Sequence, residues 1–226
     1  MELIKKKGLI IYWILLVIDC YLIFDEPIKQ IHWINFALMP LLAIYFFSNI
    51  RKNHNSTYKL YLFFAFISAW IGDVLAAFDN PLLLVPAIVC TTVMHVFYSL
   101  SLYKVKPLKI ELSQEAFFAS IIAAIGCYVL YKFIYVNLGD YKIPIVIVMI
   151  VISTTFILAC NIYSSTARRL LAISHFMPAA FLLGLSAACI AINRFFFNEP
   201  FLNVVTLLAY GYSQSLMVEG FSKMLK

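Results

Sequence analysis

Long apolar runs separated by short polar breaks dominate the sequence. A helix needs about 20 predominantly apolar residues to cross the hydrocarbon core of a bilayer. Eight segments meet this requirement: 8–24, 31–50, 57–78, 81–104, 113–135, 143–162, 168–193 and 201–220. The breaks contain charged residues, Pro and Gly, as in Asp25-Glu26-Pro27 and Asn198-Glu199-Pro200, which is typical of helix ends that meet water. Strands of a membrane barrel would alternate apolar and polar residues instead. The pattern therefore predicts an all-α polytopic membrane protein with eight transmembrane helices.

Composition supports this prediction. Hydrophobic residues make up 64% of the chain and charged residues 12%, against about 45–50% and about 25% in ordinary globular domains. So few charges cannot form the polar shell of a soluble protein, and so apolar a chain is not intrinsically disordered. No connection is long enough to hold a second domain, so we expect one transmembrane domain over residues 1–226.

The distribution of Lys and Arg predicts the orientation. Cytoplasmic connections of membrane proteins are enriched in these residues. If the N-terminus is cytoplasmic, thirteen of the 17 basic residues lie on the inner side: Lys5, Lys6, Lys7, Arg51, Lys52, Lys59, Lys104, Lys106, Lys109, Arg168, Arg169, Lys223 and Lys226. The other four are Lys29, Lys132, Lys142 and Arg194. Both termini are therefore expected in the cytoplasm. Because the basic residues lie at the ends of apolar segments, we expect no nucleic-acid partner.

Two aspartates lie inside predicted membrane segments, where an ionisable side chain is costly and suggests a functional role. Asp19 and Asp73 each lie five residues before the end of an outward-running segment. At the rise of a helix, both are roughly 7–8 Å inside the outer boundary. If their helices are neighbours, the two carboxyl groups can share a proton and keep an acid available at neutral pH. The alternative for Asp19 is solvation near the lipid headgroups.

Polar side chains on two other segments complete the candidate site. His95 and Tyr98 are three residues apart, and Tyr210 and Gln214 are four apart, so each pair shares one helix face. Hydrogen bonding between helices is the alternative role for all four. The five cysteines form no CxxC pair, and the histidines have no metal-ligand spacing. We therefore expect no metal site.

Five short motifs, read in order, resemble those of the YhhN family of membrane proteins, which includes lysoplasmalogenase. They are Met39-Pro40-Leu41-Leu42-Ala43, Ala69-Trp70-Ile71-Gly72-Asp73-Val74-Leu75, His95-Val96-Phe97-Tyr98, Ser186 to Phe195, and Tyr210-Gly211-Tyr212-Ser213-Gln214. The sequence departs from the family pattern twice. Asn35 and Phe36 replace a Lys-Pro pair, and Ala187 replaces the aspartate of a Ser-Asp pair.

The resemblance implies a hydrolase that cleaves the vinyl ether bond of a lysoplasmalogen to a fatty aldehyde and a glycerophospho-headgroup. Acid catalysis would protonate the vinyl ether, and a carboxylate would stabilise the resulting oxocarbenium ion. No cofactor is implied, and the expected partner is a lysophospholipid or another lipid. The implied residues are Asp73 and Asp19 for catalysis and His95, Tyr98, Tyr210 and Gln214 for substrate binding.

Asp19 would replace the carboxylate missing at Ala187, which lies at nearly the same depth. The alternative is a catalytically inactive lipid-binding or regulatory protein of the same fold. A small-solute transporter is disfavoured because no inverted repeat or paired broken helices are visible. We expect an integral protein of a bacterial inner (plasma) membrane, with no prediction of oligomeric state.

Overall fold

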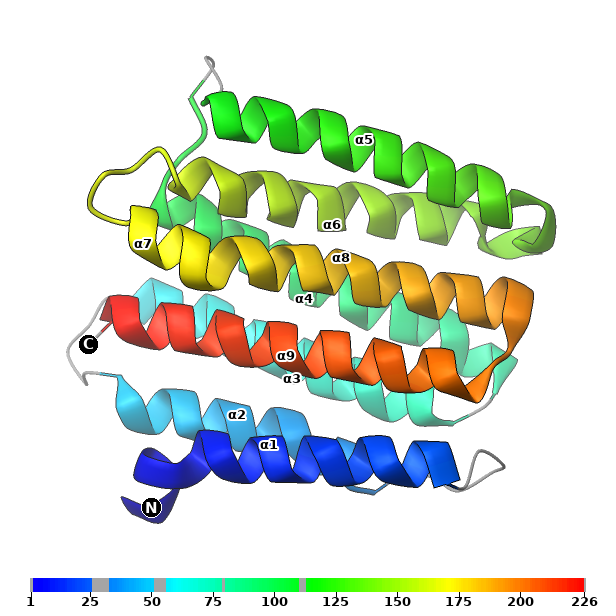
Figure 1. Cartoon of the computed structure of the whole chain (residues 1–226), viewed down its shortest axis with the longest axis horizontal. Coiled ribbons are helices and arrows are strands. Elements are labelled where there is room, and N and C mark those ends of the chain that lie inside the picture. The colour runs from blue at the N-terminus through cyan, green and yellow to red at the C-terminus, as the bar shows by residue number, and fades with distance from the viewer. Residues whose placement is uncertain (1, 26–32, 51–55, 79, 110–112, 226) are drawn as a thin grey trace.

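The computed structural model of the chain consists of helices that run back and forth along one axis (Figure 1). It describes residues 2–25, 33–50, 56–78, 80–109 and 113–225. The long helices are α1 (Glu2–Asp25), α2 (Asn35–Asn49), α3 (Ser56–Ala77), α4 (Pro81–Val105), α5 (Gln114–Ile134), α6 (Lys142–Ile162), α8 (Met177–Ile192) and α9 (Pro200–Leu225). Within the described ranges there is no strand.

The helix before α9 contains two π-helical turns. The short α7 (Arg169–Leu171) continues through a π-helical turn at Ala172–Phe176 into α8, and a second such turn follows at Asn193–Phe197. Isolated π-helical turns within α-helices occur frequently at functional sites. The whole run from Arg169 to Phe197 forms one candidate membrane span.

The predicted membrane segments are confirmed as helices. In the described residues, seven helical runs are long and apolar enough to cross a membrane, and they indicate an integral membrane protein. The exception is α2, whose 15 residues span about 22 Å, less than the roughly 30 Å of hydrocarbon. The first residues of the predicted 31–50 segment lie outside the described ranges.

Local sequence explains where several helices begin and end. Asn80 caps α4 by accepting a hydrogen bond from the Leu82 backbone N–H at 3.0 Å, and Pro81 occupies the first turn, where no backbone N–H is needed. Ser113 caps α5 in the same way through the N–H of Ala116. Asn198 adopts the left-handed conformation with φ of 58° between the last π-helical turn and α9, a conformation that Asn tolerates better than most residues.

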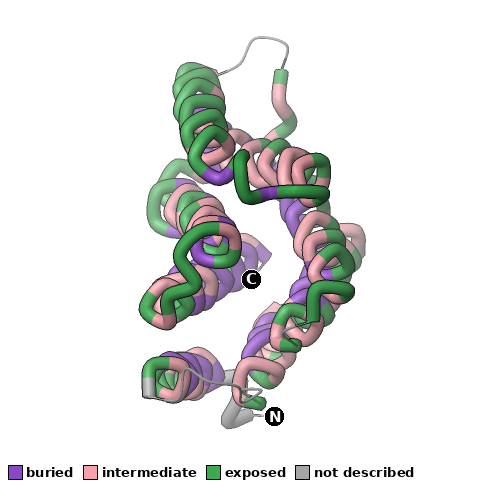
Figure 2. Tube along the Cα trace, turned by 90° about the vertical axis from the view of Figure 1, so that its right-hand side faces the viewer, coloured by how far each residue is buried: buried purple, intermediate pink, exposed green. Residues whose placement is uncertain are grey.

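The helices form two layers. One contains α1, α9 and α8, and the other contains α2, α3, α4 and α6, with α5 packed on α6 at one edge (Figures 1 and 2). Within the layers α1 packs against α9, α9 against α8, and α3 against α4, while α1 also packs against α2 and α8 against α6. The start of α1 and the end of α9 lie at the same end of the bundle (Figure 1). The cytoplasmic location of that end stays a prediction.

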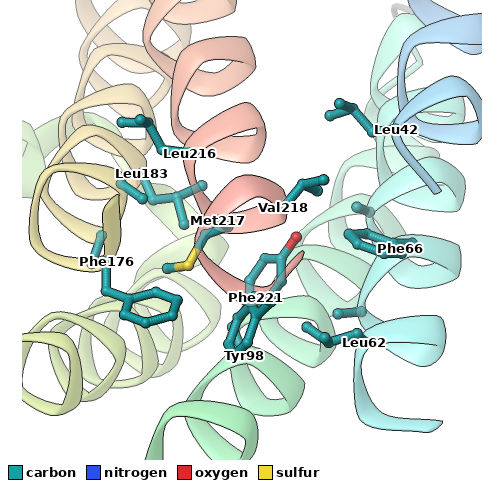
Figure 3. Packing of buried hydrophobic residues seen from close by; sticks show 14 of the residues in the cluster. Leu42, Leu62, Phe66, Tyr98, Phe176, Leu183, Leu216, Met217, Val218 and Phe221 are labelled. Carbon is teal, nitrogen blue, oxygen red and sulfur yellow. The ribbon is translucent and has the colours of Figure 1, made fainter. Parts of the chain in front are cut away.

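Buried apolar side chains fill the space between the layers. Phe66 from α3, Tyr98 from α4 and Phe221 from α9 are almost fully buried there (Figure 3). Large apolar side chains such as Phe118 and Tyr128 on α5 are instead exposed on the outside of the bundle, which is the arrangement expected of a lipid-facing surface. The core thus holds the two layers together beside the polar cluster described next.

Candidate functional site

The centre of the candidate site is a hydrogen bond between α9 and α3. The hydroxyl of Tyr210 donates to Oδ2 of Asp73 at 3.2 Å. Asp73 is half-buried and lies four residues before the end of α3 at Ala77, which is about 6 Å along the helix. Its neighbours Val74 and Leu75 are apolar. A carboxyl group in such surroundings is stabilised by few polar contacts, so the Tyr210 hydroxyl is an important one.

A second set of hydrogen bonds joins α9 to α4 beside this pair. The hydroxyl of Tyr98 donates to Oε1 of Gln214 at 2.5 Å, and Nε2 of Gln214 donates to Sδ of Met94 at 3.2 Å. The Tyr210 hydroxyl also lies 4.0 Å from the same sulfur. Tyr98, Gln214 and Met94 are almost fully buried. The side chains that sequence analysis selected on α3, α4 and α9 therefore form one connected cluster around Tyr210.

Tyr12 on α1 belongs to this cluster but was not selected from the sequence. Its buried hydroxyl donates to the backbone oxygen of Gly211 at 2.9 Å, one residue after Tyr210. A Cβ at Gly211 would lie 2.6 Å from a methyl carbon of Leu16, so a larger residue there would require the Leu16 side chain to shift. The one available signal is the four-residue spacing of Tyr12 and Leu16, which is common in apolar helices.

His95 points to a different part of the bundle. Its Nδ1 lies 3.4 Å from the hydroxyl oxygen of Thr155 on α6, and Thr155 is hydrogen-bonded to Ser99 at 2.9 Å. These three buried residues connect α4 to α6. The structure thus connects Asp73, Tyr98 and Gln214 around Tyr210 but directs His95 toward α6.

Asp19 lies on α1, whereas Asp73 lies on α3. Asp19 is fully buried, and neither of its carboxylate oxygens has a hydrogen-bond partner within the described part of the chain. Helix α1 packs mainly against α2 and α9, whereas α3 packs against α2 and α4. The shared proton considered from the sequence therefore stays a prediction.

The positions that depart from the family pattern lie at contacts between helices. Ser186 on α8 donates to the backbone oxygen of Thr206 on α9 at 3.1 Å, and the adjacent Ala187 is half-buried. Phe36 accepts a hydrogen bond through its backbone oxygen from the indole N–H of Trp70 at 2.9 Å. Trp70 therefore connects the helix that carries Asp73 to the start of α2.

Metal-ligating side chains do not gather in the described residues: no group of three or more His, Cys, Asp and Glu there could hold a metal ion. The polar groups of the cluster are hydroxyl, amide, thioether and a single carboxyl. This set can donate and accept hydrogen bonds, and Asp73 can transfer a proton.

Comparison with known proteins assigns the family. The model of the YhhN family matches residues 31–221, a span that includes Asp73, Tyr98, Tyr210 and Gln214 but not α1. The comparisons with curated proteins and with solved structures found no match. The family match covers most of the 226-residue chain and agrees with the motifs and the helical architecture. The chain belongs to the YhhN family.

Proposed function

We propose that this protein is a lysoplasmalogenase-like hydrolase that cleaves the vinyl ether bond of a lysoplasmalogen by acid catalysis. The observation that carries the proposal is the Asp73 carboxyl group, set among apolar residues near one end of α3 and hydrogen-bonded to Tyr210. A carboxyl group at membrane depth suits a lipid substrate whose reactive bond is close to the headgroup. Members of the YhhN family are in general lysoplasmalogenase-like, which favours this reaction over other hydrolyses.

In the proposed first step, Asp73 acts as a general acid. Its proton moves to the β-carbon of the vinyl ether, and the α-carbon and ether oxygen become an oxocarbenium ion. Tyr210 donates to Oδ2, which leaves Oδ1 as the oxygen that carries the proton. The carboxylate that remains after transfer stabilises the positive charge of the oxocarbenium ion.

In the second step, water adds to the α-carbon and gives its proton back to Asp73. The product is a hemiacetal, which collapses to a fatty aldehyde and releases the glycerophospho-headgroup as an alcohol. One molecule of water is consumed, and Asp73 returns to its starting form. A single carboxyl group therefore serves both steps in turn, and the sequence needs no second aspartate at Ala187.

Tyr98 and Gln214 act as positioning residues in this proposal. Both polar atoms of the Gln214 amide are already paired, with Tyr98 and with Met94. These hydrogen bonds hold α9 in place at Gln214, and Tyr210 lies one helical turn before Gln214 on the same helix. His95 remains proposed as a substrate-binding residue, on the α6 side of α4.

The second candidate function is a catalytically inactive lipid-binding protein of the same fold. The replacement of the family aspartate by Ala187 favours it. Such a protein would bind a lysolipid at the same cluster without releasing an aldehyde.

The deciding experiment is aldehyde release from a lysoplasmalogen by the purified protein in lipid nanodiscs. The hydrolase releases aldehyde and headgroup alcohol in equal amounts, and Asp73→Asn abolishes the release. Asp140→Asn is the matched control, because Asp140 is an exposed acid in a connection between helices. Lysolipid binding without any aldehyde from the wild-type protein would instead establish the inactive alternative.

A further inference from the structure

A basic surface lies where the connection between α6 and α7 meets the end of α4. Nη1 of Arg168, in the connection, donates to the backbone oxygen of Val105, the last residue of α4. Nζ of Lys106, the next residue along the chain, donates to Oγ of Ser164 in the connection. These contacts place two cationic groups at one end of the bundle, the end that also holds the start of α1 and the end of α9 (Figure 1).

Two more cations lie beside this contact. Arg169 donates to the hydroxyl of Tyr163, and its Cζ lies 4.2 Å from the centroid of that ring. Nζ of Lys104, two residues before Lys106, lies 5.3 Å from the centroid of the Tyr58 ring. Aromatic rings, hydroxyls and backbone carbonyls attract a cation without neutralising its charge. None of the four basic residues forms an ion pair with a described carboxylate, so the surface carries four uncompensated positive charges.

A buried amide holds the two segments in place. Asn161 is almost fully buried, and its Nδ2 donates to the backbone oxygen of Lys106 at 3.2 Å while its Oδ1 accepts from Oγ of Ser113 at 3.1 Å. The backbone N–H groups of Ser165 and Arg168 close two turns of the connection, with hydrogen bonds of 2.9 and 3.0 Å. A ligand therefore meets basic groups whose backbone is already ordered, which lowers the entropic cost of binding.

Phosphate is the ligand chemistry that fits this surface. Arg and Lys form strong charge-assisted hydrogen bonds with phosphate oxygens, and the connection adds the exposed hydroxyl groups of Ser164 and Thr166. One candidate membrane span ends at Val105 and another begins at Arg169, so the surface lies at the level of the lipid headgroups. A headgroup with a net negative charge fits better than a zwitterionic one, whose ammonium group the four cations would repel.

We propose that this surface binds the phosphate of an anionic glycerophospholipid from the surrounding membrane. The surface lies at the opposite end of the bundle from Asp73 (Figure 1), and binding there does not depend on the proposed hydrolysis. The enrichment of basic residues in cytoplasmic connections explains which side of the membrane they occupy, but not the hydrogen bonds that bring them together. A phosphate bound here contacts both α4 and the connection between α6 and α7, so it stabilises the folded bundle.

Thermal unfolding of the purified protein in detergent tests this proposal with four added probes: short-chain phosphatidic acid, phosphatidylglycerol, phosphatidylcholine and inorganic phosphate. The unfolding midpoint is expected to rise with the concentration of either anionic lipid, and added salt should reduce the rise. Phosphatidylcholine and inorganic phosphate at the same concentrations should leave the midpoint unchanged. An equal rise with phosphatidylcholine would show that the lipid chains alone bind, and an equal rise with inorganic phosphate would show a site for a soluble ion; either result would overturn the proposal.

The double variant Lys106→Gln, Arg169→Gln locates the site. It is expected to bind anionic lipid about tenfold or more weakly, measured from the concentration dependence of the shift relative to its own midpoint. Arg168 is retained because it also caps the end of α4. The matched control Lys132→Gln, Lys142→Gln removes the same charge at the opposite end of the bundle, where each lysine lies over a tyrosine ring, and should bind as wild type does.

Equal weakening in both double variants would show a response to net charge alone, and no weakening in the first would exclude its two residues; either result would overturn the proposed site. If the first double variant does not fold, Arg169→Gln with Lys142→Gln as its control gives the same comparison. Native mass spectrometry of these single variants then counts the anionic lipids retained by each, and the expected result is fewer retained by Arg169→Gln.

Discussion

Tyr210 and Asp73 are the smallest unit on which the proposed chemistry depends. Among the described residues, the hydrogen-bond donor to the Asp73 carboxyl group is the Tyr210 hydroxyl at 3.2 Å. Because that donor contacts Oδ2, it both orients the carboxyl group and leaves Oδ1 for proton transfer. Hydrogen bonds to charged groups contribute about 1.5–3 kcal/mol, so the loss of this one is measurable in the rate.

Replacing Tyr210 with Phe is therefore expected to lower kcat for aldehyde release by about tenfold to a hundredfold. The ring remains, so the packing of α9 is preserved and the thermal unfolding midpoint changes little. Tyr212→Phe is the matched control, because Tyr212 is exposed on the other side of α9 and is expected to keep the wild-type rate. Wild-type turnover by Tyr210→Phe would remove this hydroxyl from the mechanism.

Replacing the buried polar residues Asp19 and Gln214 with leucine should have different effects on the free energy of unfolding. Asp19 has no hydrogen bond to lose, so Asp19→Leu is expected to leave the free energy of unfolding unchanged or to raise it. Gln214→Leu leaves the buried Tyr98 hydroxyl without its acceptor and is expected to lower the free energy of unfolding by about 1–3 kcal/mol. Thermal unfolding of the purified variants in one detergent measures both. A comparable destabilisation by Asp19→Leu would mean that the chain does provide a partner for Asp19.

At the scale of helices, the contact between α1 and α9 closes one side of the candidate site. Tyr12 donates to the backbone of Gly211, and Leu16 occupies the space where a side chain at Gly211 would be. The same turn of α9 carries Tyr210 toward α3 and Gln214 toward α4. A displacement of α1 should therefore affect both stability and activity.

Gly211→Ala is expected to lower the free energy of unfolding by about 1–3 kcal/mol, because its new methyl group would lie 2.6–2.7 Å from both methyl carbons of Leu16. Aldehyde release should fall with it. Gly126→Ala provides the control: nothing lies within 4 Å of its Cβ, and the substitution favours the helix α5. The double variant Gly211→Ala, Leu16→Ala should recover part of the loss, and no recovery would show that the clash is not the cause.

At the scale of the whole molecule, the positions of the helices follow closely from the sequence, but several contacts between them do not. The apolar runs and their Pro and Asn breaks predicted every long helix, because burial in lipid determines which segments are helical. The largest differences are at polar ends: α1 begins at Glu2, six residues before the predicted start, and α9 ends at Leu225, five residues after the predicted end. The π-helical turn at Ala172–Phe176 had no signal, since it changes the hydrogen-bonding register without changing composition. Tyr12 was missed because it is one of 14 tyrosines, and the neighbours of Asp19 depend on which helices pack together, which hydropathy does not determine.

The bundle also has a predicted direction in the membrane. The sequence assigns thirteen of the 17 basic residues to the side of the N-terminus, which predicts cytoplasmic termini. A reporter that is active only in the cytoplasm, fused after the last residue, is expected to be active. The control fuses the same reporter after Leu138, in the connection between α5 and α6 at the opposite end, where it should be inactive. The reverse pair of results would contradict the topology and place Asp73 near the inner surface.

The most direct test of the central claim is to follow the proton that Asp73 is proposed to transfer. Cleavage in heavy water should deliver one deuteron to the carbon next to the aldehyde carbonyl, because that carbon is the β-carbon of the vinyl ether. Mass spectrometry of the released aldehyde measures this, with authentic aldehyde incubated with the protein in heavy water as the control for exchange. The account predicts one deuteron per aldehyde from the wild-type protein and no aldehyde from Asp73→Asn. Aldehyde without the deuteron, or release at the wild-type rate by Asp73→Asn, would contradict it.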